Sequence, residues 1–388
     1  MSKQLLVALF TSLAVTVLWY FVLYNVFLDD LRYVQSFVSD TLLDQDDKLS
    51  RTLDNNLSLV QAWIIDTVSR VSSWVVSIVA TKNIQLYFAD PRGVLPGVLT
   101  ESQATVWWWS GIYSSQSGYI ITNKHVVEDI NASYTVIDHE WNAYDVVNVR
   151  FDEILDFAVL KIDEPAVDLP VIPYVDFEQK VSVGSLVLAI GNSLHALQNS
   201  VTFGIVSATN RNLITTDSDT LYAWLIQTDT AINPWNSGGP LVNIYGEVIG
   251  ITTSIANQGQ GIGFALPVSQ AFIDATLLSV EEYGQIVRPY LGISYIDIDR
   301  NIVEQLDIQE AIDHGVYIEN VVDWSPAQQV GLRAWDIVLS LNGNVIDIHN
   351  SFLYQLYSFT SGDTIDLEIV RNGDPLTLSL VLWSWVQD

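Results

Sequence analysis

The chain has 388 residues, a length typical of two or three domains, and carries 16 Lys and Arg against 45 Asp and Glu, a net charge of −29. This acidic excess disfavours nucleic acid and anionic membrane surfaces as partners, because long-range repulsion opposes both. The absence of cysteine excludes disulfides, thiolate metal sites and a cysteine nucleophile. The apolar fraction of 49% is ample for packed cores and excludes global disorder.

Residues 4–28 contain no charged side chain. As a helix this run would measure about 37 Å at ~1.5 Å per residue, enough to cross a hydrocarbon core of about 30 Å. Lys3 precedes the run and Asp29 and Asp30 follow it, which favours a cytoplasmic N-terminus. We predict a transmembrane anchor over 4–28; a cleaved signal peptide and a buried core helix stay open as alternatives.

Residues 29–72 are polar with leucine and valine at helical spacing, which predicts a helical or flexible stalk without a ligand site. From residue 73 the pattern changes to short apolar or alternating runs separated by Gly, Asn, Asp and Pro. Many short strands at close spacing are typical of an all-β sandwich or barrel. Strand-like runs continue over residues 286–385, where two helical stretches are also predicted, near 325–331 and 350–359.

Three of these runs carry residue types that catalyse acyl transfer. His125 follows a predicted strand in TNKHVV, Asp156 precedes one in LDFAVLKI, and Ser237 lies in the glycine-rich turn NSGGPL. A serine hydroxyl needs a histidine to accept its proton, and the histidine needs a carboxylate to hold its tautomer. The chain order His, Asp, Ser is that of chymotrypsin-like barrels. Each residue taken alone is more often structural than catalytic, and the other four histidines lack metal-ligand spacing, so we predict no metal and no cofactor.

The surrounding segments carry a resemblance to a known family. In order and spacing, TNKHVV, DFAVLKI, IQTDTAINPWNSGGPLVN and GIGFALP strongly resemble the HtrA/Deg family of trypsin-like serine proteases. VRPYLGI and GVYIENVVDWSPAQQVGLRAWDIVLSLNG resemble the PDZ domain that follows the protease in that family. With one PDZ domain and a predicted anchor, the chain is similar to the DegS-type subgroup. The resemblance implies a mainly β fold: a chymotrypsin-like double β-barrel over 73–280, followed by a PDZ domain over 286–385.

The resemblance also implies roles for individual residues. His125 would be the general base, Asp156 its orienting carboxylate and Ser237 the nucleophile, and the backbone N–H groups of Trp235 and Ser237 would form the oxyanion hole. The segment Ile251, Thr252, Thr253 and Ser254 would run beside the substrate as a strand. The primary specificity pocket would be walled in part by Gly261, Ile262, Gly263 and Phe264. The family prefers small or medium aliphatic residues there.

In the second domain, the loop Tyr290, Leu291, Gly292 and Ile293 would bind a C-terminal carboxylate through its backbone N–H groups. The alternative is that these residues are simply the first strand of a small β domain. The function implied is that of a membrane-anchored extracytoplasmic serine endopeptidase, single-pass in the cell inner membrane. It would act in protein quality control on misfolded or regulatory proteins, with C-terminal peptides bound at the PDZ domain. The family is commonly homotrimeric.

One departure from the family concerns tryptophan. The chain has 13 Trp but only 21 Gly, about 5% of the residues against a usual ~7%. Residue 235 is Trp where the family motif has Gly, and the same exchange recurs at Trp324 and Trp335; Trp141, Trp224 and the run 107–109 also occupy positions that favour glycine. We hypothesise that many or all of these residues are glycine in the organism, because UGA is read as Gly in some bacterial lineages and as Trp in others. A genuine Trp235 would favour a second function, a catalytically inactive PDZ scaffold.

Overall fold

The structure is a computed structural model that describes residues 59–87, 99–163, 169, 172–175, 181–193, 197–213, 220–254, 261–298, 302–303, 312–347 and 350–384. Residues 59–71 are helical, and the 3-10 helix η2 (Ser72–Trp74) leads into the first strand. The predicted anchor over 4–28 and the rest of the predicted stalk lie outside the described residues. Within the described ranges no helix combines the length and apolar character needed to cross a membrane.

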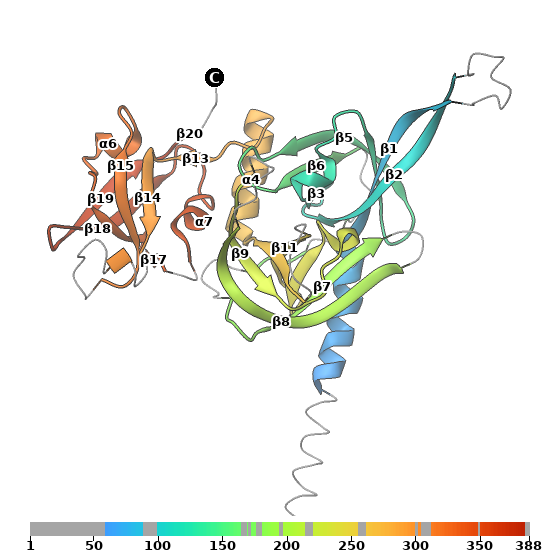
Figure 1. The fold of residues 1–388 in the computed structure, drawn as a ribbon, viewed down its shortest axis with the longest axis horizontal. Helices are drawn as coiled ribbons and strands as arrows, with labels where there is room; N and C mark the ends of the chain where they lie inside the picture. Colours follow the sequence, from blue (N-terminus) through green and yellow to red (C-terminus); the bar gives the residue numbers. More distant parts are fainter. Residues whose placement is uncertain are drawn as a thin grey trace, which may run out of the picture. The chain divides into compact units, whose positions relative to one another are not determined.

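Two closed six-stranded barrels follow one another along the chain, as predicted (Figure 1). The first has the strand order β1-β2-β3-β6-β5-β4 and the second β10-β11-β12-β9-β8-β7. The strands of the first barrel are β1 (Val75–Tyr87), β2 (Leu99–Tyr113), β3 (Tyr119–Thr122), β4 (Ser133–Ile137), β5 (Ala143–Phe151) and β6 (Ala158–Ile162). Those of the second are β7 (Leu186–Ser193), β8 (Leu197–Leu213), β9 (Tyr222–Thr228), β10 (Pro240–Asn243), β11 (Val248–Thr253) and β12 (Gly263–Pro267).

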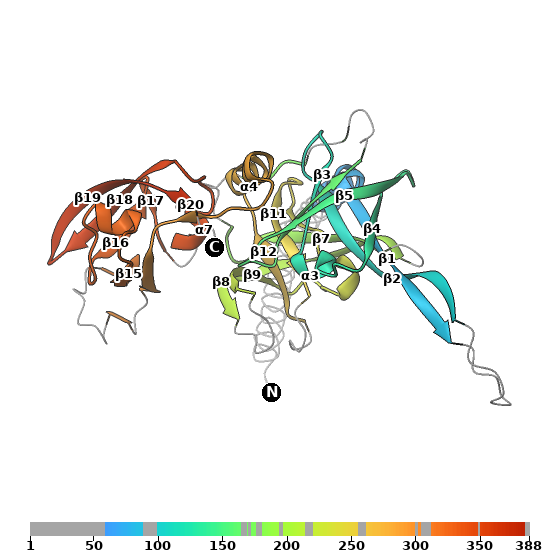
Figure 2. The ribbon, with the colours of Figure 1, turned by 90° about the horizontal axis from the view of Figure 1, so that it is seen from above.

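Side-chain alternation explains why these runs form barrel strands. In β4 the buried Tyr134 and Val136 alternate with more exposed neighbours, the period of two that a strand with one core face requires. The interior of the first barrel is filled by branched aliphatic side chains, among them Ile78, Ile120 and Leu160. In both views the β1–β2 hairpin continues outward past the strands that close this barrel (Figure 2).

Among the described residues, three helices lie between or directly after the barrel strands. α3 (Lys124–Val127) follows β3, η3 (Pro234–Asn236) precedes β10, and α4 (Gln270–Tyr283) follows β12. α4 begins at Ser269, whose hydroxyl accepts a hydrogen bond from the Phe272 N–H, and ends at Gly284 in the left-handed conformation. α3 contains His125, and η3 ends directly before Ser237.

The C-terminal part forms a separate sheet with the order β14-β15-β16-β18-β19, and β17 pairs with β16. Its elements are β13 (Pro289–Tyr290), β14 (Ile293–Asp297), β15 (Val316–Val321), α6 (Pro326–Gln329), β16 (Ile337–Leu341), β17 (Asn344–Val345), α7 (Phe352–Leu356), β18 (Thr364–Arg371), β19 (Asp374–Val381) and β20 (Trp383–Ser384). The two predicted helices are confirmed as α6 and α7. β14 lies at one end of the strand order, so its outer edge is unpaired within the described residues.

Candidate active site

His125 and Asp156 come together because they follow and precede two neighbouring strands. β3 pairs with β6 through Thr122 and Ala158, so α3, directly after β3, and Asp156, two residues before β6, meet at one end of the barrel. Nδ1 of His125 lies 2.8 Å from Oδ2 and 3.0 Å from Oδ1 of Asp156, and the His125 backbone N–H donates to Oδ1 at 3.1 Å. The carboxylate therefore fixes the ring with Nδ1 engaged and leaves Nε2 for another partner.

The Asp156 carboxylate is buried, with 2% of the residue exposed. Burial disfavours its charged form, but the His125 ring and backbone N–H and the Thr253 hydroxyl all donate to it, and together they hold the pKa of Asp156 below its usual range. Thr253 donates to Oδ2 at 2.9 Å, and the Asn123 side-chain amide donates to the Asp156 carbonyl at 3.0 Å. Asp156 is consequently an anion at neutral pH, as an orienting carboxylate must be.

Ser237 lies directly after η3 in a turn that the first barrel holds in place. The Ser110 N–H donates to the Ser237 carbonyl at 3.1 Å, and the Ser110 hydroxyl donates to the Trp235 carbonyl at 2.9 Å. Gly238 has φ +83°, and a Cβ there would stand 2.2 Å from the Ser110 carbonyl oxygen. The turn therefore requires glycine at 238 both for its backbone angle and for the close approach of β2.

The structure does not join Ser237 to His125 by a hydrogen bond. The Ser237 hydroxyl accepts a hydrogen bond from the Ser254 N–H at 2.9 Å. Nε2 of His125 is buried and has no hydrogen-bond partner among the described residues. A free acceptor at Nε2 is what a general base needs, and catalytic hydrogen bonds are often long in substrate-free structures.

The two expected oxyanion donors belong to one short turn. The N–H of Trp235 lies in η3, and the N–H of Ser237 lies directly after it. Trp235 itself lies in η3, and 54% of it is exposed. Its bulk therefore lies at the surface immediately beside the nucleophile.

The segment predicted to run beside the substrate needs a correction. β11 pairs with β10 on one side and β12 on the other, so Ile251 and Thr252 have no open backbone edge and are fully buried. The Thr252 N–H donates to the Gly239 carbonyl and its own carbonyl accepts from the Gly238 N–H, both at 2.9 Å. Ile251 and Thr252 therefore support the nucleophile turn, and the accessible part of the segment is its end at Ser254.

The other predicted pocket residues lie at the start of β12. Gly261 and Ile262 are exposed, whereas Phe264 is buried and pairs with Thr253. A Cβ at Gly263 would stand 2.5 Å from the Ile232 side chain, so Gly263 and Ile232 are in close contact. Ile232 was not identified from the sequence, because nothing in TAINPW distinguishes it from a core residue.

The predicted carboxylate-binding loop includes a second constrained glycine. Gly292 has φ +84°, and a Cβ there would stand 2.2 Å from the Ser325 Cβ. The Gly292 carbonyl accepts from the Val322 N–H at 2.8 Å, and the Leu291 carbonyl accepts from the Ala327 N–H at 3.1 Å. Tyr290 belongs to β13 and Ile293 opens β14. The four residues thus form a turn at the start of an edge strand, with two carbonyls tied down.

Three residues that position the catalytic groups were not predicted from the sequence. Ser110 holds the Ser237 turn, and Asn123 donates to the Asp156 carbonyl. The Trp109 ring meets the His125 ring edge-on, with centroids 5.4 Å apart. Thr253 was expected to contact substrate, but its hydroxyl binds Asp156. A polar residue beside a predicted catalytic residue is the only signal that could have pointed to Asn123. In the ranges that the structure describes, no cluster of three or more potential metal ligands is found.

We expect Thr253→Val to lower kcat about 10- to 100-fold, since a hydrogen bond to a charged group contributes about 1.5–3 kcal/mol. The loss comes from a less firmly held Asp156 carboxylate, so KM should change little. Thr253→Ser, which keeps the hydroxyl, should restore most of the activity. Equal rates for the valine and serine variants in a steady-state assay would contradict this role.

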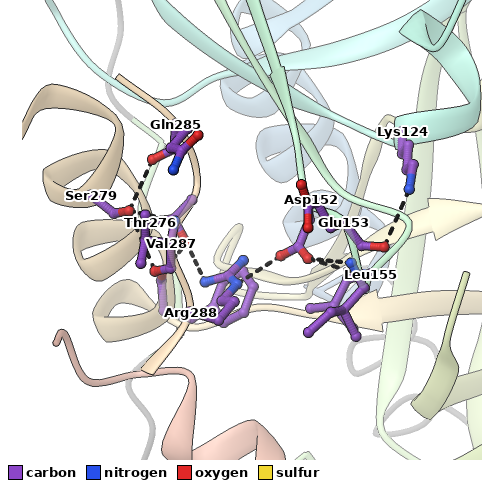
Figure 3. A network of polar contacts seen from close by, with 11 residues as sticks. Lys124, Asp152, Glu153, Leu155, Thr276, Ser279, Gln285, Val287 and Arg288 are labelled. Atoms are coloured by element: carbon purple, nitrogen blue, oxygen red, sulfur yellow. Dashed lines mark hydrogen bonds and ion pairs between the residues drawn. The ribbon is translucent and has the colours of Figure 1, made fainter. Parts of the chain in front are cut away.

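A buried ion pair fixes the loop that precedes Asp156 (Figure 3). Arg288 Nε lies 2.7 Å from Asp152 Oδ2, with side-chain exposures of 4% and 1%. Asp152 Oδ1 accepts from the N–H groups of Ile154 and Leu155 at 2.8 and 3.1 Å, and Arg288 also donates to the Thr276 hydroxyl at 2.8 Å. Arg288, which follows α4, is thereby bound to Asp152, four residues before the catalytic carboxylate of Asp156.

Arg288→Met is expected to lower the free energy of unfolding by about 3–5 kcal/mol, because it leaves the Asp152 carboxylate buried without its cation. The exposed Arg333 provides the control: Arg333→Met should change stability by no more than about 0.5 kcal/mol. Thermal and urea unfolding of both variants measure the difference. Similar unfolding curves for the two would show that the pair is not structurally important.

Comparison with known proteins agrees with this geometry. Residues 109–251 match the model of the trypsin-like peptidase domain, and residues 289–382 match that of the PDZ domain. The fold and the site therefore define a trypsin-like peptidase followed by a PDZ domain.

Curated relatives narrow the class further. The chain is 37% identical over 287 residues to "Serine protease Do-like HtrA" of Bacillus subtilis (strain 168), covering 70% of this chain and 62% of that protein. It is 34% identical over 278 residues to "Probable periplasmic serine endoprotease DegP-like" of Chlamydia trachomatis serovar D, covering 70% of this chain and 53% of that protein. The chain thus spans between half and two thirds of the length of these relatives.

A solved structure titled "HtrA-type protease AlgW with decapeptide" superposes with a TM-score of 0.57 at 28% identity, covering 83% of this chain and 98% of that one. The chain belongs to the HtrA family of serine proteases.

Proposed function

We propose that the chain is a serine endopeptidase with His125 as general base, Asp156 as orienting carboxylate and Ser237 as nucleophile. The observation that carries the proposal is the His125–Asp156 pair with its buried Asp156 carboxylate. Thr253 donates to that carboxylate, and the next residue, Ser254, donates to the Ser237 hydroxyl, so two consecutive residues connect the pair to the nucleophile. The relatives above are named as proteases, which supports an enzyme and lends no support to the scaffold alternative.

In the proposed reaction, the Ser237 hydroxyl attacks the scissile carbonyl while Nε2 of His125 accepts its proton. The Trp235 and Ser237 N–H groups stabilise the negative charge that develops on the carbonyl oxygen. The imidazolium, stabilised by Asp156, then protonates the leaving amine. Water next attacks the acyl-enzyme while His125 accepts its proton, and His125 returns that proton to Ser237 as the acid product leaves. The Ser254 N–H must release the Ser237 hydroxyl for the attack to begin.

We also propose that the PDZ domain captures C-terminal peptides by strand addition. The outer edge of β14, which pairs with no strand among the described residues, would supply backbone partners. α7 packs against β14 through the Phe352 and Tyr295 rings, whose centroids are 5.2 Å apart. The constrained turn at Gly292 supports a carboxylate site at the start of the edge.

A binding measurement tests this site with decapeptides that end in Val, Leu or Phe. We expect peptides with a free carboxylate to bind at least about tenfold more tightly than their C-terminal amides, because a charge-assisted hydrogen bond is lost with the carboxylate. Gly292→Ala should abolish the difference through its clash with Ser325. Gly343→Ala is the matched control, with φ +79° and no atom within 4 Å of the added Cβ. Equal binding of acid and amide would contradict the proposal.

The remaining proposals concern location and assembly. We propose that residues 4–28 anchor the chain in the cell inner membrane, with a stalk over 29–72, a protease domain over 73–280 and a PDZ domain over 286–385 outside the cytoplasm. Homologues named as periplasmic support an extracytoplasmic site of action on misfolded or regulatory proteins. A homotrimer is proposed from the family. Alkaline extraction of membranes tests the anchor: the full chain should stay with the lipid, and a chain lacking residues 1–28 should not.

The endopeptidase proposal is tested with β-casein as an unfolded substrate and the full chain in detergent. If the parent chain cleaves β-casein and the Ser237→Ala variant does not, the result supports the endopeptidase proposal. Tight peptide binding by the PDZ domain without any cleavage would favour the scaffold.

A further inference from the structure

The backbone of this protein places tryptophan where L-residues other than asparagine and aspartate rarely occur. Seven described non-glycine residues have φ in the left-handed region: Asn210, Asn342, Asn372, Trp141, Trp224, Trp324 and Trp335. Asparagine tolerates this conformation, whereas for a bulky side chain it is an outlier, at about 1–2 kcal/mol per residue. Every left-handed position in the described chain is thus occupied by Gly, Asn or Trp.

At three of these positions the side chain is not packed into the protein. Trp141, Trp324 and Trp335 are 62%, 85% and 77% exposed, although tryptophan is highly buried on average. Each of their backbone N–H groups donates a hydrogen bond. Trp141 donates to the Asp138 carbonyl at 3.2 Å, Trp324 to the Gln328 side chain at 2.8 Å and Trp335 to the Ile318 carbonyl at 2.7 Å. The turns therefore use the backbone of these residues, while the indole rings add strain without burial.

Trp224 shows the same conflict inside the protein. It lies in β9 and has φ +47°, at a point where the pairing of β8 with β9 shifts its register. Its N–H donates to the Asn212 side chain at 2.9 Å. The residue is 5% exposed, and its indole Nε1 is buried with no hydrogen-bond partner among the described residues. An irregular strand position with left-handed φ is typical of glycine, which would remove both the strain and the unpaired donor.

Trp235 is the position of this set that bears on catalysis. Its φ lies outside the left-handed region, so backbone strain does not apply here. Its ring is nevertheless 54% exposed in the turn N-P-W-N-S-G-G, beside the nucleophile. Glycine would leave the donor N–H in place, remove the bulk beside a scissile bond, and let the 234–236 turn reorient its peptide groups.

We propose that the codon at residues 141, 224, 235, 324 and 335 is UGA and that the source organism inserts glycine there. The excess of tryptophan and shortage of glycine in the chain agree with such a codon reassignment. The proposal rests on backbone geometry and exposure, and stands whether or not the protein is an active protease.

The direct test is peptide mass spectrometry of the protein isolated from cells of its own organism, together with the gene sequence. We expect glycine in the peptides that contain residues 141, 224, 235, 324 and 335, with UGA at each codon. Tryptophan in any of the five peptides, or UGG at any of the five codons, would overturn the proposal, because it assigns all five to one reading of one codon.

Four recombinant variants provide a second readout that needs no native material. Replacing Trp141, Trp324 and Trp335 singly with glycine should raise the folded-to-unfolded ratio by about 5- to 30-fold each, the equivalent of the relieved strain. Trp383→Gly is the control, since Trp383 has an ordinary strand conformation and should lose stability with glycine. Equal destabilisation at all four positions would overturn the proposal.

Discussion

Replacing Ser237 with alanine is expected to lower kcat on β-casein by about 10⁶-fold, the loss typical when the nucleophile of a catalytic triad is removed. The alanine variant retains the turn, because the contacts that hold it are made by the backbone carbonyls of Ser237 and Trp235. Substrate binding should therefore persist, and the loss should appear in kcat. Initial rates of casein cleavage with purified full-length protein give the measurement.

The control for this substitution is an exposed serine near the same barrel. Ser117→Ala removes the hydroxyl of an exposed turn residue between β2 and β3 and should leave cleavage unchanged. If Ser237→Ala and Ser117→Ala cleaved casein equally fast, the observed cleavage would not come from this site.

Asp156→Asn should lower kcat by about 10⁴-fold, the effect seen for the equivalent change in the chymotrypsin-type triad. Asparagine keeps the shape of the side chain but can present its amide N–H₂ to Nδ1 of His125, which lies 2.8 Å from Oδ2. The ring would then carry its proton on Nε2 and could not accept one from Ser237. Steady-state kinetics at neutral pH measure the loss, and a decrease smaller than about tenfold would contradict the assigned role.

The lowered pKa of Asp156 should also make the stability of the fold depend on pH. The pKa of Asp156 is lowered in the folded chain, so its charged form stabilises the fold above the ordinary aspartate value of about 3.9. This contribution is lost as the pH falls through the folded-state pKa. Asp156→Asn should therefore unfold with a weaker dependence on acid pH than the parent chain, as followed by urea midpoints from pH 7 to pH 3.

Several features of the fold could be predicted because they depend on local patterns. The run TIDLEIVR alternates apolar and polar residues, and β18 has the matching alternation of buried and exposed side chains. SPAQQ begins with a serine and a proline, the start signal of a short helix, and α6 begins there with Ser325 as its cap. The barrels and the PDZ sheet follow from many such runs in the order typical of one family.

Features that depend on tertiary contacts could not be predicted. Arg288 and Asp152 are 136 positions apart, and no spacing rule connects a linker arginine to a loop aspartate. The hydroxyl of Thr253 comes to Asp156 from the other barrel across 97 positions. Ile251 and Thr252 were assigned to the substrate because a strand was expected there, but pairing on both of its edges cannot be read from one sequence.

The unusual tryptophan positions could be predicted only in part. Composition and family motifs indicate that some tryptophans occupy glycine positions. Only the backbone angles distinguish Trp141, Trp224, Trp324 and Trp335 from tryptophans in ordinary strands such as Trp383. Trp109, also among the suspected residues, packs edge-on against His125 with an ordinary backbone.

The central claim is that His125 and Asp156 activate Ser237 as a nucleophile. Labelling with a fluorophosphonate tests it most directly, since the reagent reacts with activated serines and needs no knowledge of the substrate. The full chain, prepared with tryptophan and with glycine at residue 235, is treated with the reagent, digested and mapped by mass spectrometry. We expect at least the glycine form to carry one adduct, on Ser237, and this adduct should be lost when His125 is replaced by alanine. Absence of an adduct on Ser237 in both forms, or labelling unaffected by His125→Ala, would contradict it.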